Sequence, residues 1–182
     1  GPGWSAGRLA GSAWRGRAGE MPVSLCSGTA SPEQRQQNFT NGVAKASINV
    51  VLITMDGKNI LVDTGYGTVA PGKSELLPAF EKMGLKPESI DTVLLTHMHI
   101  DHVGGLLQHK QRVFPKAKIL VSRPELEFWL NEAKNNSKND NAALVQRVAD
   151  EYGADLPAPF SFGDTVLPGI TALAATGHTP GH

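Results

Sequence analysis

The chain has 182 residues, of which 40% are hydrophobic and 19% are charged, a composition typical of one globular domain and not of a disordered segment. Lysine plus arginine equals aspartate plus glutamate, at 17 each, and no basic stripe is visible, which argues against a nucleic-acid partner. No apolar run approaches the ~20 residues that span a bilayer, and the single cysteine excludes an internal disulfide framework. We therefore expect no membrane contact and a cytoplasmic location, with a periplasmic or secreted parent as the alternative.

Residues 1–20 differ from the rest of the chain. They begin Gly-Pro-Gly, as after cleavage of a tag, and contain three arginines but no acidic residue before Glu20. They lack the unbroken apolar centre of a secretory signal. We interpret residues 1–20 as a leader or as vector-derived residues, expect them to be disordered, and exclude them from the fold. Met21 is then the candidate native start, and residues 21–182 form the domain.

The next part of the chain predicts a hairpin between two helices. Residues 32–39 are a short helical candidate. The uncharged, β-branched run Ser47–Thr54, the turn signal Asp56-Gly57 and the returning run Asn59–Asp63 predict two antiparallel strands. A helix is predicted over Ser74–Met83, because apolar residues recur there at helical spacing and Ser74 is a suitable N-cap.

The second half alternates strands with helices. Residues 92–96 predict a strand that ends at a run of histidines, and a helix is expected after it over 103–113. The remaining elements are a strand at 118–121, helices at 124–133 and 141–151, and a strand pair at 165–167 and 170–174. This alternation predicts an α/β fold with a mixed sheet covered by helices. Ligand sites in such folds gather at the carboxyl ends of the strands.

Four metal-binding side chains lie within six positions directly after the apolar segment at residues 93–95. Alternate residues of an extended segment project to one side, so His97 and His99 can present two imidazoles to one cation. A hydrolytic zinc ion takes three protein ligands and keeps one position for water, and His178, on a glycine-flanked loop, is the candidate third ligand. Asp101 and His102 then face a second metal position. Structural, hydrogen-bonded histidines are the alternative, which this density disfavours.

Such a site suits hydrolysis. The ion or ions lower the pKa of bound water to ~7, and Asp101 could orient the resulting hydroxide or take its proton. Imidazole and carboxylate donors favour Zn²⁺, in one or two ions, although iron, manganese, cobalt or nickel also fit. Asp63 either caps a turn or orients the histidine loop, and we favour the second role. His182 is either a ligand, or else a residue behind the ligands or part of a disordered terminus, and we favour these non-ligand interpretations.

Three segments together resemble the motifs of the metallo-β-lactamase superfamily. They are the run His97-x-His99-x-Asp101-His102 with its two glycines, the segment Leu61–Gly65 and the segment Gly177–His182. Residues 112–115, 127–130 and 166–170 also resemble its methyl parathion hydrolase and lactonase-like branch. The resemblance covers residues 45–182. It implies an αββα sandwich, of which we expect only the N-terminal portion here, because family members continue with a second half beyond the third motif.

The resemblance also implies a role for each candidate residue. The implied ligands are His97, His99 and His178 for a first zinc, and Asp101 and His102 for a second. Asp63 matches the aspartate that supports the metal loop, and His182 matches a position near the site that is usually not a ligand. The family's bridging aspartate and final histidine have no counterpart in this sequence, so we expect a chain truncated after the third metal motif.

The function implied by the resemblance is hydrolysis of esters, lactones, lactams or phosphotriesters by metal-activated hydroxide, acting on a small-molecule substrate. The alternative is a non-catalytic metal-binding or assembly module, in which the ion stabilises the fold. Half a sandwich exposes an apolar sheet face, so we expect a homo-oligomer or a complementary fragment as partner. A nuclease, a third class within the superfamily, is disfavoured by the neutral charge.

Overall fold

The computed structural model describes residues 10–22, 31–39, 42–69, 75–156 and 159–182. Strands and helices alternate along the chain, so the predicted α/β class is confirmed. The strands are β1 (Ala10–Pro22), β2 (Val43–Met55), β3 (Lys58–Val62), β4 (Thr92–Leu94), β5 (Leu107–Gln108), β6 (Gln111–Arg112), β7 (Lys118–Leu120), β8 (Thr165–Leu167) and β9 (Ile170–Thr171). The α-helices are α2 (Pro32–Asn38), α3 (Leu76–Lys82), α4 (Ile100–Val103), α5 (Arg123–Asn135) and α6 (Asp140–Tyr152). Short 3₁₀ turns are η1 (Gly67–Val69), η2 (Pro87–Ser89), η3 (Gly104–Leu106) and η4 (Gly153–Asp155).

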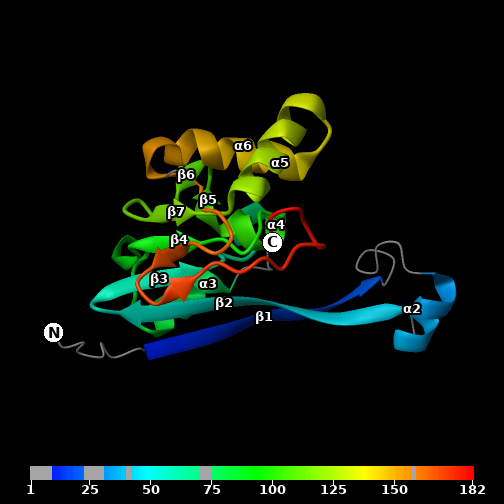
Figure 1. Ribbon diagram of the computed structural model, residues 1–182. Coiled ribbons are helices and arrows are strands. Elements are labelled where there is room, and N and C mark those ends of the chain that lie inside the picture. The colour runs from blue at the N-terminus through cyan, green and yellow to red at the C-terminus, as the bar shows by residue number, and fades with distance from the viewer. Residues whose placement is uncertain (1–9, 23–30, 40–41, 70–74, 157–158) are drawn as a thin grey trace, which may run out of the picture.

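A five-stranded sheet in the order β1-β2-β3-β4-β7 forms the centre of the fold (Figure 1). Strands β2 and β3 are the predicted hairpin, and its turn residues Asp56 and Gly57 both have positive φ, as a two-residue type I′ turn requires. Strands β3, β4 and β7 run parallel to one another. Their carboxyl ends therefore meet at one edge of the sheet, where sites in α/β folds form.

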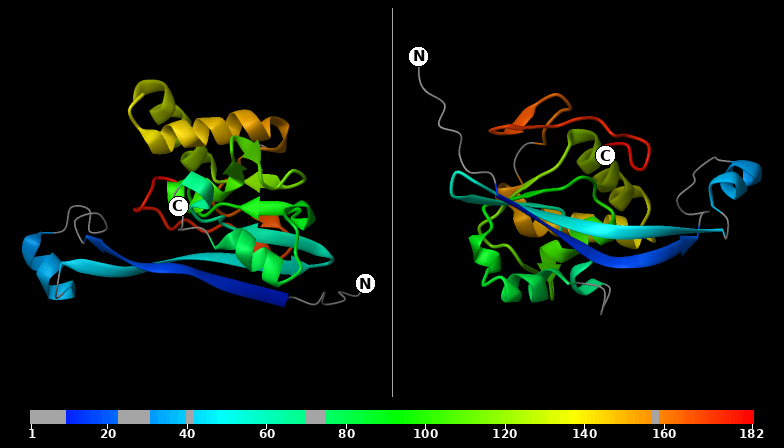
Figure 2. Two further views of the ribbon diagram at one scale, coloured as in Figure 1. Left: turned by 180° about the vertical axis from the view of Figure 1, so that it is seen from behind. Right: turned by 90° about the horizontal axis from the view of Figure 1, so that it is seen from below.

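The exclusion of residues 1–20 from the fold is wrong for residues 10–20. Strand β1 pairs antiparallel with β2, from Ala10 opposite Thr54 to Pro22 opposite Val43. The two strands form a ribbon that extends beyond the rest of the sheet, with α2 near its far end (Figures 1 and 2). Sequence reasoning missed β1 because its run of glycine, alanine, serine and arginine has no apolar alternation. Residues 1–9 lie outside the described residues.

A second prediction is also wrong, because residues 103–113 are not one helix. Helix α4 ends at Val103, η3 follows, and β5 and β6 form a two-stranded hairpin. The two residues of its turn, His109 and Lys110, have φ values of 50° and 66°, which is the geometry of a tight hairpin turn. The predicted N-cap Ser74 lies outside the described residues.

Helices α5 and α6 pack against each other and cover the segment that follows β4 (Figure 1). Val145, Val148 and Tyr152 of α6 are fully buried in the core. The Tyr152 hydroxyl donates to the Leu106 carbonyl at 3.0 Å, which ties α6 to the η3 turn. Met98, between the first two histidines, is also fully buried in this core, so the histidine segment is anchored by an apolar side chain. No helix of the described part is long and apolar enough to cross a bilayer.

Candidate metal centre

The site begins where the parallel strands β3 and β4 end. Asp63 directly follows β3, and its backbone N–H donates to the Leu94 carbonyl at 2.8 Å. Its carboxylate is buried, with Oδ1 accepting from the Thr96 N–H at 2.8 Å and Oδ2 accepting from the Thr96 hydroxyl at 2.8 Å. The φ of Asp63 is 62°, in the left-handed region that aspartate tolerates better than most residues. Asp63 therefore holds the chain immediately before His97.

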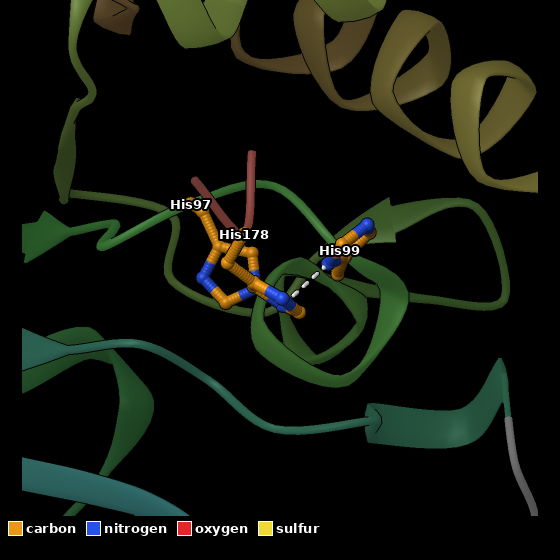
Figure 3. A group of neighbouring side chains, drawn as sticks. All are labelled: His97, His99 and His178. Carbon is orange, nitrogen blue, oxygen red and sulfur yellow. Dashed lines mark hydrogen bonds between the residues drawn. The ribbon is translucent and has the colours of Figure 1, made fainter. Parts of the chain in front are cut away.

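The structure brings together the three histidines that sequence reasoning named as the first ligand set. His97 and His99 come from the segment after β4, and His178 comes from the C-terminal segment (Figure 3). One ring nitrogen from each lies within 4.8 Å of the other two, and His99 Nδ1 is 3.0 Å from His178 Nε2. Within the described ranges, this is the only group of three or more potential ligands that close together. Their role as metal ligands stays a prediction.

Hydrogen bonding fixes which nitrogen of His97 is free. The Thr96 hydroxyl donates its proton to Asp63, so toward His97 Nδ1, at 3.0 Å, it can only accept. Nδ1 must then carry the proton, and Nε2 is left with a lone pair. The His97 side chain is buried, and its Nε2 has no hydrogen-bond partner. An unpartnered buried polar atom costs ~1–3 kcal/mol, a cost that a cation between the three nitrogens would remove. The residues present therefore fit a metal such as zinc.

Two histidines of this group, His97 and His99, have lowered pKa values. Burial, followed by the neighbouring His102 and His99, lowers the pKa of His97 to about 3. Burial and the adjacent His178 also lower the pKa of His99, against the opposing effects of Asp101 and Glu125. Metal ions bind the neutral imidazole, so proton competition at His97 is weak near neutral pH.

The two residues predicted to bind a second metal contact each other. His102 Nδ1 lies 2.8 Å from Asp63 Oδ2, and His102 Nε2 lies 3.5 Å from Asp101 Oδ2. Burial acts to lower the pKa of His102, but the two flanking carboxylates outweigh it and raise the pKa to about 9. Burial likewise acts to raise the pKa of Asp101, but His102 outweighs it and the pKa falls. His102 is thus an imidazolium between two carboxylates, and its role in binding a second metal stays a prediction.

His182 lies beside the histidine group. Its ring centroid is 4.7 Å from that of His97 and 5.8 Å from that of His178. Its backbone carbonyl accepts from the Ala175 N–H at 2.8 Å, which closes the loop that carries His178. This position agrees with a residue next to the ligands, although the role itself is untested.

Sequence reasoning missed the polar side chains that hold the histidine segment from the helix side. Asn141 of α6 accepts from the Ile100 N–H at 2.6 Å and donates to the Met98 carbonyl at 2.8 Å. Glu125 of α5 is fully buried and accepts from the Met98 N–H at 2.8 Å. Trp129, one turn later, places its ring 5.3 Å from that of His99. The sequence does indicate Glu125, because it lies on the same face of the helix as the apolar Leu126 and Trp129. A carboxylate buried on such a face needs hydrogen-bond donors around it.

Comparison with known proteins agrees with this geometry. Residues 44–182 match the sequence profile of the Metallo-beta-lactamase superfamily. An N-acyl homoserine lactonase of Bacillus cereus is 26% identical over 149 residues, which cover 68% of this chain and 51% of the lactonase. The uncharacterized protein YobT of Bacillus subtilis is 27% identical over 135 residues, 74% of this chain and 54% of YobT. The chain thus spans about half the length of these curated relatives.

Solved structures show the same fold. The hydrolase AbOPH, described as a member of the beta lactamase superfamily, is 28% identical with a TM-score of 0.76, and the match covers 98% of this chain and 66% of AbOPH. AidC, a dizinc quorum-quenching lactonase solved with a homoserine product, is 23% identical with a TM-score of 0.75, covering 98% of this chain and 67% of AidC. At that identity the second likeness supports the fold alone.

Proposed function

Because the chain belongs to the metallo-beta-lactamase superfamily, we propose that it is a metal-dependent hydrolase of small carboxylic or phosphoric esters, with lactones as the first substrates to test. The superfamily profile covers the whole of the histidine site. Lactones come first because a relative of similar sequence is an N-acyl homoserine lactonase. Zinc is the proposed metal, since a group of three imidazoles suits it.

The observation that carries the proposal is the unpartnered Nε2 of His97. It is buried, bears a lone pair, and lies in a group whose nitrogens are within 4.8 Å of one another. His97, His99 and His178 would hold the ion. A zinc ion with three imidazole ligands supplies Lewis acidity and makes water nucleophilic near neutral pH.

The remaining residues position groups around that ion. Asp63 fixes the tautomer of His97 through Thr96 and holds His102 directly. Asp101 is half-buried and has a lowered pKa, so it is a carboxylate near neutral pH. A carboxylate of low pKa is a good hydrogen-bond acceptor but a weak base. We therefore assign Asp101 to orienting the attacking water rather than to storing its proton.

Zinc binding and turnover are the direct test. The metal-free chain is titrated with Zn²⁺ by calorimetry, and hydrolysis of an acyl homoserine lactone, a β-lactam and a phosphotriester is then followed with and without the metal. We expect His178→Ala to lose tight binding, since two imidazoles remain, and His109→Ala, at an exposed turn, to bind as the parent does. Equal zinc affinity of His178→Ala and the parent would refute the proposed ligand set. Tight binding without turnover of any substrate would refute autonomous catalysis by this chain.

A second function, a metal-stabilised assembly module, is favoured by one observation. His102 and Asp101 contact each other, and the described residues hold no second group of three or more closely spaced potential ligands beside His97, His99 and His178. A single ion would then act on stability, and a second copy or a complementary fragment would be the partner. Molecular mass measured by light scattering, with zinc and with chelator, separates the two: a zinc-dependent oligomer without turnover supports the module.

A further inference from the structure

Glu125 contacts both segments that carry the histidines. Its Oε1 accepts from the Met98 N–H at 2.8 Å, between His97 and His99. Its Oε2 accepts from the Gly181 N–H at 3.0 Å, three residues after His178. Met98 precedes Glu125 by 27 residues, and Gly181 follows it by 56 residues. One carboxylate therefore bridges the two halves of the proposed ligand set.

The carboxylate is built into the fold rather than exposed to solvent. Glu125 is fully buried, and its Oε1 also accepts from the Trp129 indole N–H at 2.8 Å. It lies in the first turn of α5, whose N-terminus is the favourable end of the helix for a negative charge. Three N–H donors and the helix end together compensate its desolvation.

The C-terminal loop fits closely against the same residue. A Cβ on Gly181 would overlap the backbone nitrogen of Glu125, so only glycine fits there. The Gly181 carbonyl also accepts from the Ser122 hydroxyl at 2.6 Å. The backbone N–H and the backbone carbonyl of Gly181 are thus both bonded at the start of α5, which fixes how far the loop extends toward His97.

We propose that Glu125 is a positioning residue of the metal centre, which sets the distance between the His97–His99 segment and His178 before any ion binds. The inference rests on the proposed metal site. Glu125 is too deeply buried for contact with substrate, and its effect reaches the ion through Met98 and Gly181. Loss of an outer residue of this kind typically costs ~10–100-fold in metal affinity.

Glu125→Gln tests the bridge with little change in volume. The amide keeps one oxygen but presents an NH₂ group on the other side, so either Gly181 or the Met98–Trp129 pair faces a donor and loses its acceptor. We expect the Zn²⁺ dissociation constant to rise ~10–100-fold and the visible absorption bands of the Co²⁺-loaded chain to change at saturating metal. Glu127→Gln is the matched control, because Glu127 is an exposed acid on the same helix.

Hydrogen exchange of the metal-free chain gives a readout independent of the metal. In Glu125→Gln we expect faster exchange of residues 175–182 or of residues 97–100, with helix α6 unchanged. If Glu125→Gln does not fold, Gly181→Ala replaces it, since it displaces the loop and leaves the carboxylate bonded to Met98; the same loss of zinc affinity is expected.

The outcomes separate this inference from the proposed function. A parent chain that binds no zinc refutes the metal site, and the exchange measurement then still tests the bridge. A parent that binds zinc, together with a Glu125→Gln chain of equal affinity, unchanged Co²⁺ spectrum and unchanged exchange, overturns the inference alone. A variant that is only less stable, but has the parent's spectrum and affinity, assigns Glu125 a structural role and also overturns it.

Discussion

Replacing Asp63 by asparagine removes one charge at the junction of the two strand ends while leaving the backbone undisturbed. Asparagine tolerates the left-handed conformation of this position, where φ is 62°. Its oxygen can still accept from the Thr96 N–H, but its NH₂ then faces His102 Nδ1, which in the parent donates to Oδ2 at 2.8 Å. Because two donors cannot bond, His102 must give up its proton at Nδ1.

The size of the effect follows from the charge on His102. Its pKa of about 9 makes it an imidazolium at neutral pH, and a hydrogen bond to a charged group contributes ~1.5–3 kcal/mol. The Thr96 hydroxyl can reverse its direction, so its bond to Asp63 adds little to the loss. We expect Asp63→Asn to lower the free energy of unfolding of the metal-free chain by about 2–3 kcal/mol and to lower the pKa of His102.

Urea denaturation near neutral pH measures the first quantity, and an NMR titration of the histidine ring protons measures the second. Asp91→Asn is the control, because Asp91 also bonds a side chain, Lys58 at 2.8 Å, but at the surface. A surface pair contributes ~0–1 kcal/mol. If Asp63→Asn costs no more than Asp91→Asn and His102 still titrates near pH 9, the assignment of a buried carboxylate–imidazolium pair is wrong.

Three further predictions concern the same edge of the sheet. First, the free energy of unfolding of the metal-free chain should be highest near pH 6.5. Because the pKa of His97 is lowered to about 3, His97 binds a proton only in the unfolded chain, and the free energy of unfolding should fall by about 1.5 kcal/mol from pH 6.5 to about 5. Because the pKa of His102 is raised to about 9, the folded chain holds a proton that the unfolded chain releases, and the free energy of unfolding should fall by about 1.5 kcal/mol from pH 6.5 to about 8. Urea titrations across this range should show both limbs, and His97→Asn should weaken the acid limb, to which His99 with its lowered pKa also contributes, and leave the alkaline limb in place. Second, Gly105→Ala should destabilise the chain by more than about 2 kcal/mol, because the added Cβ would overlap the Thr64 carbonyl. Gly84→Ala is the control: its Cβ would enter open space, but its φ of 67° should still cost about 1 kcal/mol. Equal shifts in the melting temperature of the two variants would contradict the close approach of Gly105 to Thr64. Third, Asn141→Ala should cost about 1–3 kcal/mol by leaving the Ile100 N–H unpaired, and hydrogen exchange of residues 98–102 should rise with it, while unchanged exchange would refute the contact.

The regular part of the fold was predictable because local signals and tertiary structure agree. The β2–β3 hairpin follows from a β-branched run and an Asp-Gly turn, and both turn residues adopt the left-handed backbone. Helices α5 and α6 follow from apolar residues at helical spacing, and those residues are buried. In these segments the side-chain pattern and the burial carry the same information.

The two incorrect predictions arise where pairing, and not side-chain pattern, decides the structure. Strand β1 is held by backbone hydrogen bonds to β2, and these impose no alternation on a sequence of small residues. Residues 107–112 turn back as β5 and β6, although their composition suits a helix as well. Secondary structure that depends on a partner strand leaves little trace in the segment itself.

The histidines were predictable because metal ligands are unusual residue types at short spacing, but the residues that hold them are not unusual. Glu125 and Asn141 lie four residues before the buried Trp129 and Val145, on the apolar faces of their helices, but helical spacing alone does not say which groups a polar residue on such a face bonds. Met98 lies in the irregular segment between β4 and α4, and Ile100 is the first residue of α4, so the N–H groups of both residues lack a strand or helix partner. Buried N–H groups of this kind must find acceptors elsewhere. The start of α5 and the start of α6 supply those acceptors as side chains. When a helix covers an irregular segment that carries ligands, a polar residue near the start of that helix is therefore a candidate for positioning the segment. Such a residue is identified because the backbone N–H groups of the segment need acceptors, and not by a sequence motif.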